Sequence, residues 1–203
     1  MTALNALVSK DDITISMDTL VSGRTKEGAL TPLYFTQKFH ILPSAQSVIA
    51  GTGMFDILRE AIGLSQKLLV RDVSTLAELI SDYLGTRDNS ALLPDKGTAT
   101  IYIFGFDMDQ HTHAYALRSG ENFNIDEIAN YQNPKYILKP QQSEEKMRVL
   151  TEYTQNDNLS LELQFKKIME QQKKWDDELD ASDKCKVNIG GEWISASRDF
   201  KNR

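Results

Sequence analysis

Short β-rich segments, one of them with a two-residue hydrophobic period, dominate the start of the chain. Four such segments lie in the first 51 residues, at 3–8, 13–20, 33–42 and 46–51. In the second of them, Ile13, Ile15 and Met17 alternate with polar residues, which is typical of a half-buried strand. A Lys-Asp-Asp turn separates the first two segments and a Pro-Ser turn separates the last two. The pattern therefore predicts two consecutive hairpins.

The period then changes to that of a helix. Apolar residues fall on one helical face from Phe55 to Ser65, and again from Leu76 to Leu84. Thr75 is the predicted N-cap of the second helix, because Glu78 follows it at capping-box spacing. Residues 98–106 (TATIYIFGF) are nearly continuously apolar, which predicts a strand buried on both faces. Residues 113–118 are expected to pair with it across a polar turn.

The second half of the chain predicts two more helices and a final hairpin. No firm element is predicted for 121–142, where only YILK has the composition of a strand. Helices are predicted over 143–153 and 158–180, the second being the longest in the chain. Residues 185–189 and 192–197 are predicted to pair around Gly190 and Gly191, and the last six residues are expected to fray.

The order of these elements favours the α+β class. Strands cluster with strands and helices with helices, whereas doubly wound α/β sheets alternate the two along the chain. At 203 residues, without repeats or low-complexity tracts, the chain is expected to form one domain over 1–203. Two sheets packed together and flanked by helices would bury the apolar faces described.

Charge and cysteine content narrow the functional classes. The 23 basic and 29 acidic side chains give a net charge of −6, which argues against a broad nucleic-acid-binding surface. Cys185 is the single cysteine, so no intrachain disulfide and no zinc site with two cysteine ligands can form. The first residues lack the pattern of a secretory signal, and no segment has the length of a membrane span. We expect a cytoplasmic protein that binds neither nucleic acid nor membranes.

Several short motifs, in order, resemble the proteasome β-subunit family of N-terminal-nucleophile (Ntn) hydrolases. They are Thr2 after the initiator Met, Lys10-Asp11, Met17-Asp18-Thr19, Lys38-Phe39-His40-Ile41-Leu42, Ala50-Gly51-Thr52-Gly53 and Gly105-Phe106-Asp107. The resemblance covers roughly residues 2–120 and implies a four-layer αββα sandwich. It also implies self-assembly into a homo-oligomer, such as a ring, and a peptide or amide substrate.

The resemblance implies a site built around Thr2. If Met1 is removed, the free α-amino group of Thr2, with an ordinary pKa of about 7.7 to 8, can serve as base for its own hydroxyl. Lys38 is then the lysine beside the nucleophile and Asp18 the acid that orients this lysine. A main-chain N–H at Gly51 is the candidate oxyanion donor. This mechanism requires no cofactor and no metal.

Two regions depart from the family pattern. Where the family has a Ser-Gly-Ser-like turn and an Asp-x-x-Ser-Gly-Gly stretch, this chain has NFNIDEIA and Lys186-Val187-Asn188-Ile189-Gly190-Gly191. The polar partners are missing, although the paired glycines are kept. The alternative is therefore a catalytically inactive member that binds a partner or builds an assembly. A third interpretation treats the resemblance as accidental and the chain as an unrelated α+β domain.

The remaining candidates have ordinary structural explanations. Gly51 and Gly53 suit a strand-to-helix turn as well as an oxyanion site, Asp18 suits a turn, and Lys38 suits a half-buried strand. Acidic and histidine residues alternate after the apolar strand, at Asp107, Asp109, His111 and His113. On an extended strand they would share one face, as metal ligands do, but a polar hairpin turn is the favoured interpretation.

Overall fold

The computed structural model describes residues 2–93, 97–156, 158–183 and 185–199. Within these residues the helices are α1 (Phe55–Ser65), α2 (Val73–Thr86), α3 (Glu144–Thr154) and α4 (Leu161–Asp177). The strands are β1 (Leu4–Val8), β2 (Asp12–Asp18), β3 (Leu20–Arg24), β4 (Leu30–Phe35), β5 (Phe39–Leu42), β6 (Ser47–Gly53), β7 (Ala99–Phe106), β8 (Thr112–Arg118), β9 (Ile125–Asn130), β10 (Lys135–Lys139) and β11 (Trp193–Asp199).

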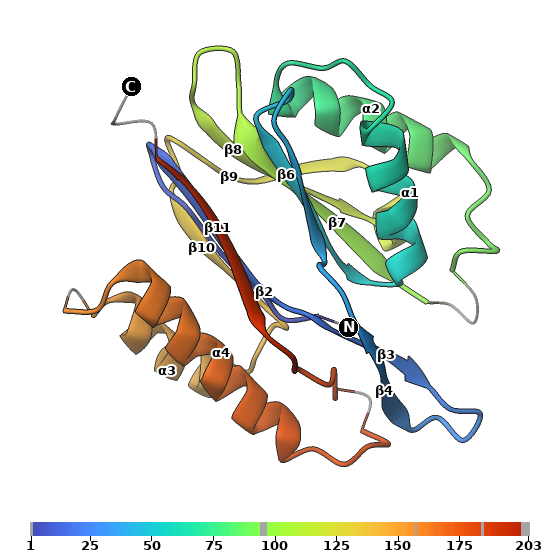
Figure 1. Ribbon diagram of the computed structural model, residues 1–203, viewed down its shortest axis with the longest axis vertical. Coiled ribbons are helices and arrows are strands. Elements are labelled where there is room, and N and C mark those ends of the chain that lie inside the picture. Colours follow the sequence, from blue (N-terminus) through green and yellow to red (C-terminus); the bar gives the residue numbers. More distant parts are fainter. Residues whose placement is uncertain (1, 94–96, 157, 184, 200–203) are drawn as a thin grey trace. The chain divides into compact units, whose positions relative to one another are not determined.

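A five-stranded antiparallel sheet in the order β5-β6-β7-β8-β9 carries α1 and α2 (Figure 1). Its centre is β7, whose residues from Ile101 to Phe106 are all buried, as the apolar run predicts. Ile49, Ile101 and Leu117 pack from the sheet against Ile57 and Leu76 of the two helices in one hydrophobic cluster. Burial of this cluster, worth about 25 cal/mol per Å² of apolar surface, holds the layer together.

The second sheet has four strands in the order β10-β1-β2-β11, and α3 and α4 lie beside it. The longest helix, α4, turns Phe165, Ile168 and Met169 inward, and Met169 joins a second cluster made with Ala3, Val187 and Ile189. A serine caps the start of each helix, Ser143 for α3 and Ser160 for α4. Its hydroxyl oxygen accepts the main-chain N–H of the residue three positions later. The predicted helix at 143–153 and the centre of that at 158–180 are thereby confirmed.

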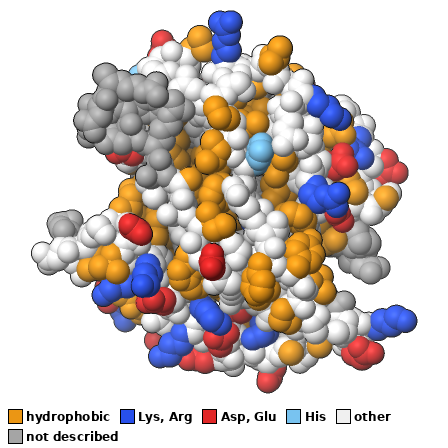
Figure 2. Space-filling model, in the orientation of Figure 1, with side chains coloured by type: hydrophobic (Ala, Val, Ile, Leu, Met, Phe, Trp, Pro, Cys, Tyr) orange, Lys and Arg blue, Asp and Glu red, His pale blue; other side chains and the backbone are white. Residues whose placement is uncertain are grey.

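The chain contacts divide these elements into two compact units that interleave along the sequence. One is formed mainly by residues 15–37 and 137–196 with the start of β1, and the other by residues 7–14 and 38–136. The single domain expected over 1–203 stays a prediction. In the part of the chain that the structure describes, no helix is long and apolar enough to span a membrane. Acidic and basic side chains intermingle on the face drawn in Figure 2.

The predicted N-cap of α2 is wrong. Asp72, not Thr75, precedes the helix, and its Oδ1 accepts the N–H of Thr75 at 2.9 Å while its Oδ2 accepts the Thr75 hydroxyl at 2.9 Å. A carboxylate at the N-cap both accepts orphan N–H groups and faces the positive end of the helix dipole. Thr75 is thus the capped residue, three positions inside.

The sequence pattern does not predict two of the strand pairs. Residues 20–35 contain the ribbon β3-β4, with Leu20 paired to Phe35 and Arg24 to Leu30, so the single run expected over 33–42 is broken before β5. The polar sequence IDEIAN forms β9, an edge strand beside β8. Edge strands bury one face at most, and β9 buries only Ala129, so a hydrophobic period is absent.

The predicted hairpin around Gly190 and Gly191 is also wrong in its first half. Residues 185–189 form no strand, because the N–H groups of Val187 and Ile189 donate instead to the Asp176 carboxylate, at 2.7 and 3.0 Å. Only β11 forms, over Trp193–Asp199. Fraying was expected for 198–203, of which residues 200–203 lie outside the described residues.

Candidate active site

Asp18, the last residue of β2, is hydrogen-bonded to the start of the chain. It is 1% exposed, and its Oδ1 accepts the main-chain N–H of Ala3 at 2.9 Å. The N–H of Asp18 donates in return to the carbonyl of Ala3 at 3.3 Å. Asp18, the predicted acid, therefore forms hydrogen bonds with both main-chain polar groups of Ala3, the residue next to Thr2. Thr2 itself is 8% exposed, and Met1 lies outside the described residues.

The paired glycines complete the surroundings of Asp18. The N–H of Gly190 donates to Asp18 Oδ2 at 3.4 Å, and the carbonyl of Gly190 accepts the N–H of Leu20 at 3.1 Å. Gly191 has φ of +80°, and a Cβ there would collide with the hydroxyl of Thr19. The glycines retained from the family pattern thus allow close approach of two backbone segments.

Lys38 and Gly51 belong to the other compact unit. Lys38 directly precedes β5 and is 3% exposed, so the alternative interpretation of Lys38 as the solvated residue of a half-buried strand is wrong. Lysine is rarely so deeply buried without a partner, and Lys38 has one. Gly51 lies inside β6, paired to Ile101, with the side chain of Leu58 in α1 only 3.2 Å from where a Cβ would stand. Helix packing alone is thus a reason for glycine at 51.

The region that departs from the family pattern is built on an acid that sequence reasoning did not single out. Asp176, in the last turn of α4 and 5% exposed, accepts the two N–H groups of Val187 and Ile189. Lys186 donates from Nζ to the carbonyls of Asp176 and Leu179, at 2.7 and 2.9 Å, and so caps the end of the helix. Ile189 is 2% exposed, in an apolar cluster. This segment is therefore held by structural contacts. In the sequence, the only sign of this role is that Asp176 falls on the face of the helix that also carries Ile168 and Gln172.

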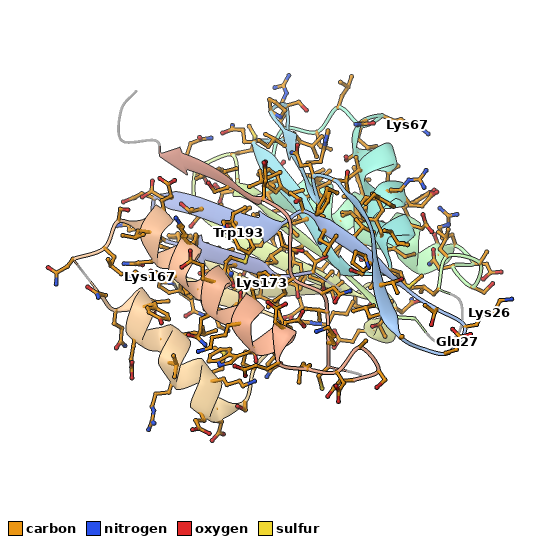
Figure 3. The ribbon with its side chains drawn as sticks, turned by 60° about the horizontal axis from the view of Figure 1, so that its bottom comes forward. Lys26, Glu27, Lys67, Lys167, Lys173 and Trp193 are labelled. Carbon is orange, nitrogen blue, oxygen red and sulfur yellow. The ribbon has the colours of Figure 1, made fainter. Side chains whose placement is uncertain are left out.

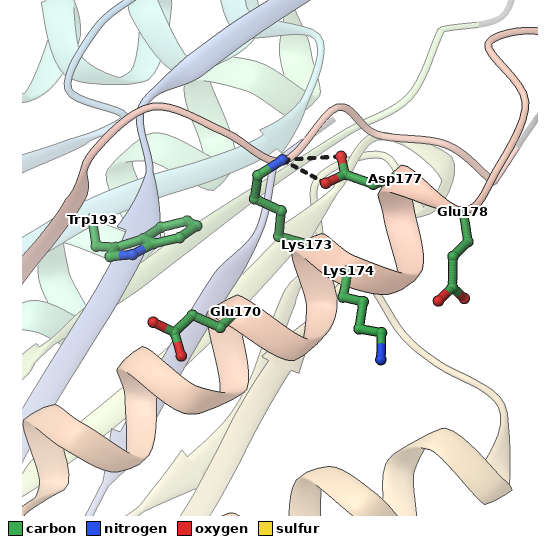
Figure 4. Close-up of a pocket in the computed structure, with 6 residues that line it drawn as sticks. All are labelled: Glu170, Lys173, Lys174, Asp177, Glu178 and Trp193. Carbon is green, nitrogen blue, oxygen red and sulfur yellow. Dashed lines mark hydrogen bonds and ion pairs between the residues drawn. The ribbon is translucent and has the colours of Figure 1, made fainter.

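A depression of about 430 Å³ lies between α4 and the start of β11 (Figures 3 and 4). Its lining consists of Glu170, Lys173, Lys174, Asp177, Glu178 and Trp193. Lys173 Nζ contacts both carboxylate oxygens of Asp177, at 2.9 and 2.8 Å, one helical turn away. Charged side chains that pair with each other on one helix are typical of a solvated face.

Comparison with known proteins finds similarity in structure only. No family model matches the sequence, and no curated protein matches it. The chain is similar in structure to Anbu (ancestral beta-subunit) from Yersinia bercovieri, with a TM-score of 0.67 and 8% identity over 97% of this chain and 81% of that one. It is also similar to Thiobacillus denitrificans BPH, solved in complex with epoxomicin, with a TM-score of 0.61 and 13% identity over 97% and 98%.

A third neighbour is an assembled protein. It is Anbu from Pseudomonas aeruginosa, solved as a helical assembly, with a TM-score of 0.63 and 11% identity over 98% of this chain and 81% of that one. These neighbours are proteasome-type proteins, so the α+β class and the Ntn-hydrolase fold predicted from the sequence are confirmed. A different α+β fold is thereby excluded.

Proposed function

We propose that this protein is an Ntn-type amide or peptide hydrolase whose nucleophile is Thr2, freed by removal of Met1. The observation that carries the proposal is the bond from the N–H of Ala3 to Asp18 Oδ1, which holds the residue next to Thr2 against the strand-two acid. Buried Lys38, Gly51 and the fold give further support. In this scheme Lys38 is the lysine beside the nucleophile, Asp18 orients it, and Gly51 donates to the oxyanion.

The α-amino group of Thr2 acts as the base in both steps of the proposed reaction. The Thr2 hydroxyl oxygen bonds to the substrate carbonyl carbon while its proton passes to the α-amino group of Thr2. The carbon–nitrogen bond then breaks, and the amine leaves with that proton. Water, deprotonated by the same amino group, attacks the resulting ester and restores the threonine.

Intact-mass measurement of the untagged protein tests this proposal. We expect loss of Met1, followed by one adduct per chain with a β-lactone electrophile and with epoxomicin, the compound in the BPH structure. Thr2→Ser should still react, because it keeps a hydroxyl next to the amine, whereas Thr2→Ala should not. Retained Met1, or an adduct that persists in Thr2→Ala, would contradict the assignment.

The alternative is a non-catalytic protein that builds an assembly from copies of itself, and it has its own support. Ile189 and Lys186 stand where the family has polar partners, and both are engaged in structural contacts. The ribbon β3-β4, whose tip carries Lys26 and Glu27 (Figure 3), exposes Leu33, Tyr34 and Phe35 by 60, 49 and 67%. Three adjacent exposed apolar side chains are typical of an interaction surface.

Sedimentation separates assembly from catalysis. We expect the protein to form oligomers and Leu33→Asp to shift them toward monomer, because a charge would be buried at the contact. Leu69→Asp is the matched control, since Leu69 is 98% exposed and belongs to the other compact unit. A monomer at every concentration, or equal effects of the two variants, would remove self-association through β4. Oligomers without a Thr2 adduct would favour the non-catalytic alternative.

A further inference from the structure

Two histidines converge on one carboxylate at the tip of the β7-β8 hairpin. His111 Nδ1 and His113 Nε2 lie 3.3 and 3.1 Å from the same oxygen, Oδ2 of Asp107. Asp109 adds a second carboxylate, and the nearest ligand atoms of Asp107, Asp109 and His111 all lie within 4.8 Å of one another. The polar turn expected from the sequence is present, and it gathers two imidazoles and two carboxylates.

The spacing is that of neighbouring ligands around one ion. Two atoms that each lie about 2.1 Å from a metal at an angle of about 90 to 110° are about 3.0 to 3.4 Å apart. The two nitrogen–oxygen distances at Asp107 fall in that interval.

His113 lies between two carboxylates at the edge of this cluster. Glu127 Oε1 is 2.6 Å from its Nδ1, and Asp107 Oδ2 is 3.1 Å from its Nε2. If Nε2 binds a metal ion, the N–H at Nδ1 is the one that Glu127 accepts. A carboxylate that orients a histidine in this way is usual behind metal ligands.

Neighbouring groups hold the side chains of this turn in place. The ring of Tyr131 stacks on His111 with centroids 4.0 Å apart, and Asp107 Oδ1 accepts the N–H groups of Asp109 and His111, at 2.9 and 2.8 Å. Side chains of this turn stay partly exposed, His111 by 41% and His113 by 15%, so an ion has access.

We propose that Asp107, Asp109, His111 and His113 bind one divalent transition-metal ion of the Zn²⁺ type, with Glu127 positioning His113. Mixed imidazole and carboxylate donors favour such an ion over Mg²⁺, which prefers oxygen ligands alone. The ion would join the ends of β7 and β8 and leave the proposed Thr2 chemistry untouched. The site is therefore independent of whether the protein is a hydrolase.

Calorimetric titration of the untagged protein with ZnCl₂ tests the site. We expect one ion per chain, no displacement by excess Mg²⁺, and binding at least about tenfold weaker in His111→Gln and in Asp109→Asn, since each removes a ligand. Glu127→Gln should weaken binding by about tenfold without removing a ligand, because it loosens His113. Circular dichroism of each variant checks that it is folded.

The third histidine of the chain supplies the matched control. His40, in β5, is three strands away from His113 across the sheet, which is about 14 Å. His40→Gln should bind Zn²⁺ as the parent protein does, and on addition of Zn²⁺ the imidazole NMR signals of His111 and His113 should shift while those of His40 do not. No binding at about 1 mM Zn²⁺, or equal binding in His111→Gln, would overturn the proposal. In that case the four side chains form only a polar turn.

Discussion

The side-chain amides of Asn5 and Gln172 face each other and bond reciprocally. Asn5 Nδ2 donates to Gln172 Oε1 at 2.9 Å, and Gln172 Nε2 donates back to Asn5 Oδ1 at 3.2 Å. Asn5 is fully buried in β1, and Gln172, 1% exposed in α4, also donates to the carbonyl of Lys139 in β10. One amide pair thus links two strands and the helix that covers them.

A double-mutant cycle measures this link. Asn5→Ala and Gln172→Ala should each lower the free energy of unfolding by about 1 to 3 kcal/mol, because each leaves a buried amide unpaired. The double variant should cost less than the sum by about 1 kcal/mol, since no orphaned amide remains. Urea denaturation gives the values. Strict additivity would show that the two amides do not support each other.

Asp176 and its neighbour Asp177 form a matched pair of acids. Asp176→Asn replaces one of two acceptor oxygens with a donor that faces a main-chain N–H, so we expect a loss of about 2 kcal/mol or more. Asp177→Asn breaks only an exposed ion pair with Lys173 and should cost less than about 1 kcal/mol. Thermal unfolding of both proteins compares them. Equal losses would contradict the anchoring of Val187 and Ile189 by Asp176.

The two glycines at the end of β6 should respond differently to alanine. Gly53 has φ of +89°, and a Cβ would collide with the carbonyl of Thr98, so Gly53→Ala should cost about 2 kcal/mol or more. Gly51 needs only a small shift of Leu58, and Gly51→Ala should cost less. Denaturant midpoints decide the order. If Gly51→Ala were the more damaging, the described packing of α1 on β6 would be incorrect.

Acid should weaken the ion pair between Glu60 and Arg87. Arg87 Nη1 lies 2.6 Å from Glu60 Oε2, and the Tyr83 hydroxyl donates to the same oxygen at 3.0 Å. The hydrogen bond from Arg87 first, and that from Tyr83 second, lower the pKa of Glu60 below its ordinary value. The stability that this adds is present above the unfolded-state pKa and is lost as pH falls through the folded-state pKa.

Glu60→Gln isolates that contribution. The variant should melt lower than the parent protein at pH 7, by less than about 4 °C because both side chains are about one third exposed, and the difference should shrink toward pH 3. Asp56→Asn, at a more exposed pair with Arg59, should change the melting temperature less. A difference that grows in acid would reverse the sign assigned to Glu60.

The sequence predicts elements whose burial is periodic and misses those fixed by single polar contacts. The faces of α1, α2 and α4 follow from the helical period, and the buried strand at 98–106 follows from its nearly continuous apolar run. The N-cap at Asp72 and the irregular segment from Val187 to Ile189 depend on which carboxylate reaches which N–H, and spacing along the chain does not encode this. Among the site residues, the bond of Asp18 to Ala3, the burial of Lys38 and the anchoring role of Asp176 required the structure.

The strand order β10-β1-β2-β11 has a consequence for synthesis. The first two strands of the chain lie between two strands from its last third, residues 135–139 and 193–199. The β1 edge of this hairpin therefore stays unpaired until β10 has been translated, and the β2 edge stays unpaired until β11, near the end of the chain, has followed. Closing such distant pairs is slow, so the nascent hairpin depends on shielding, by a chaperone or by the chain itself, for most of its time on the ribosome.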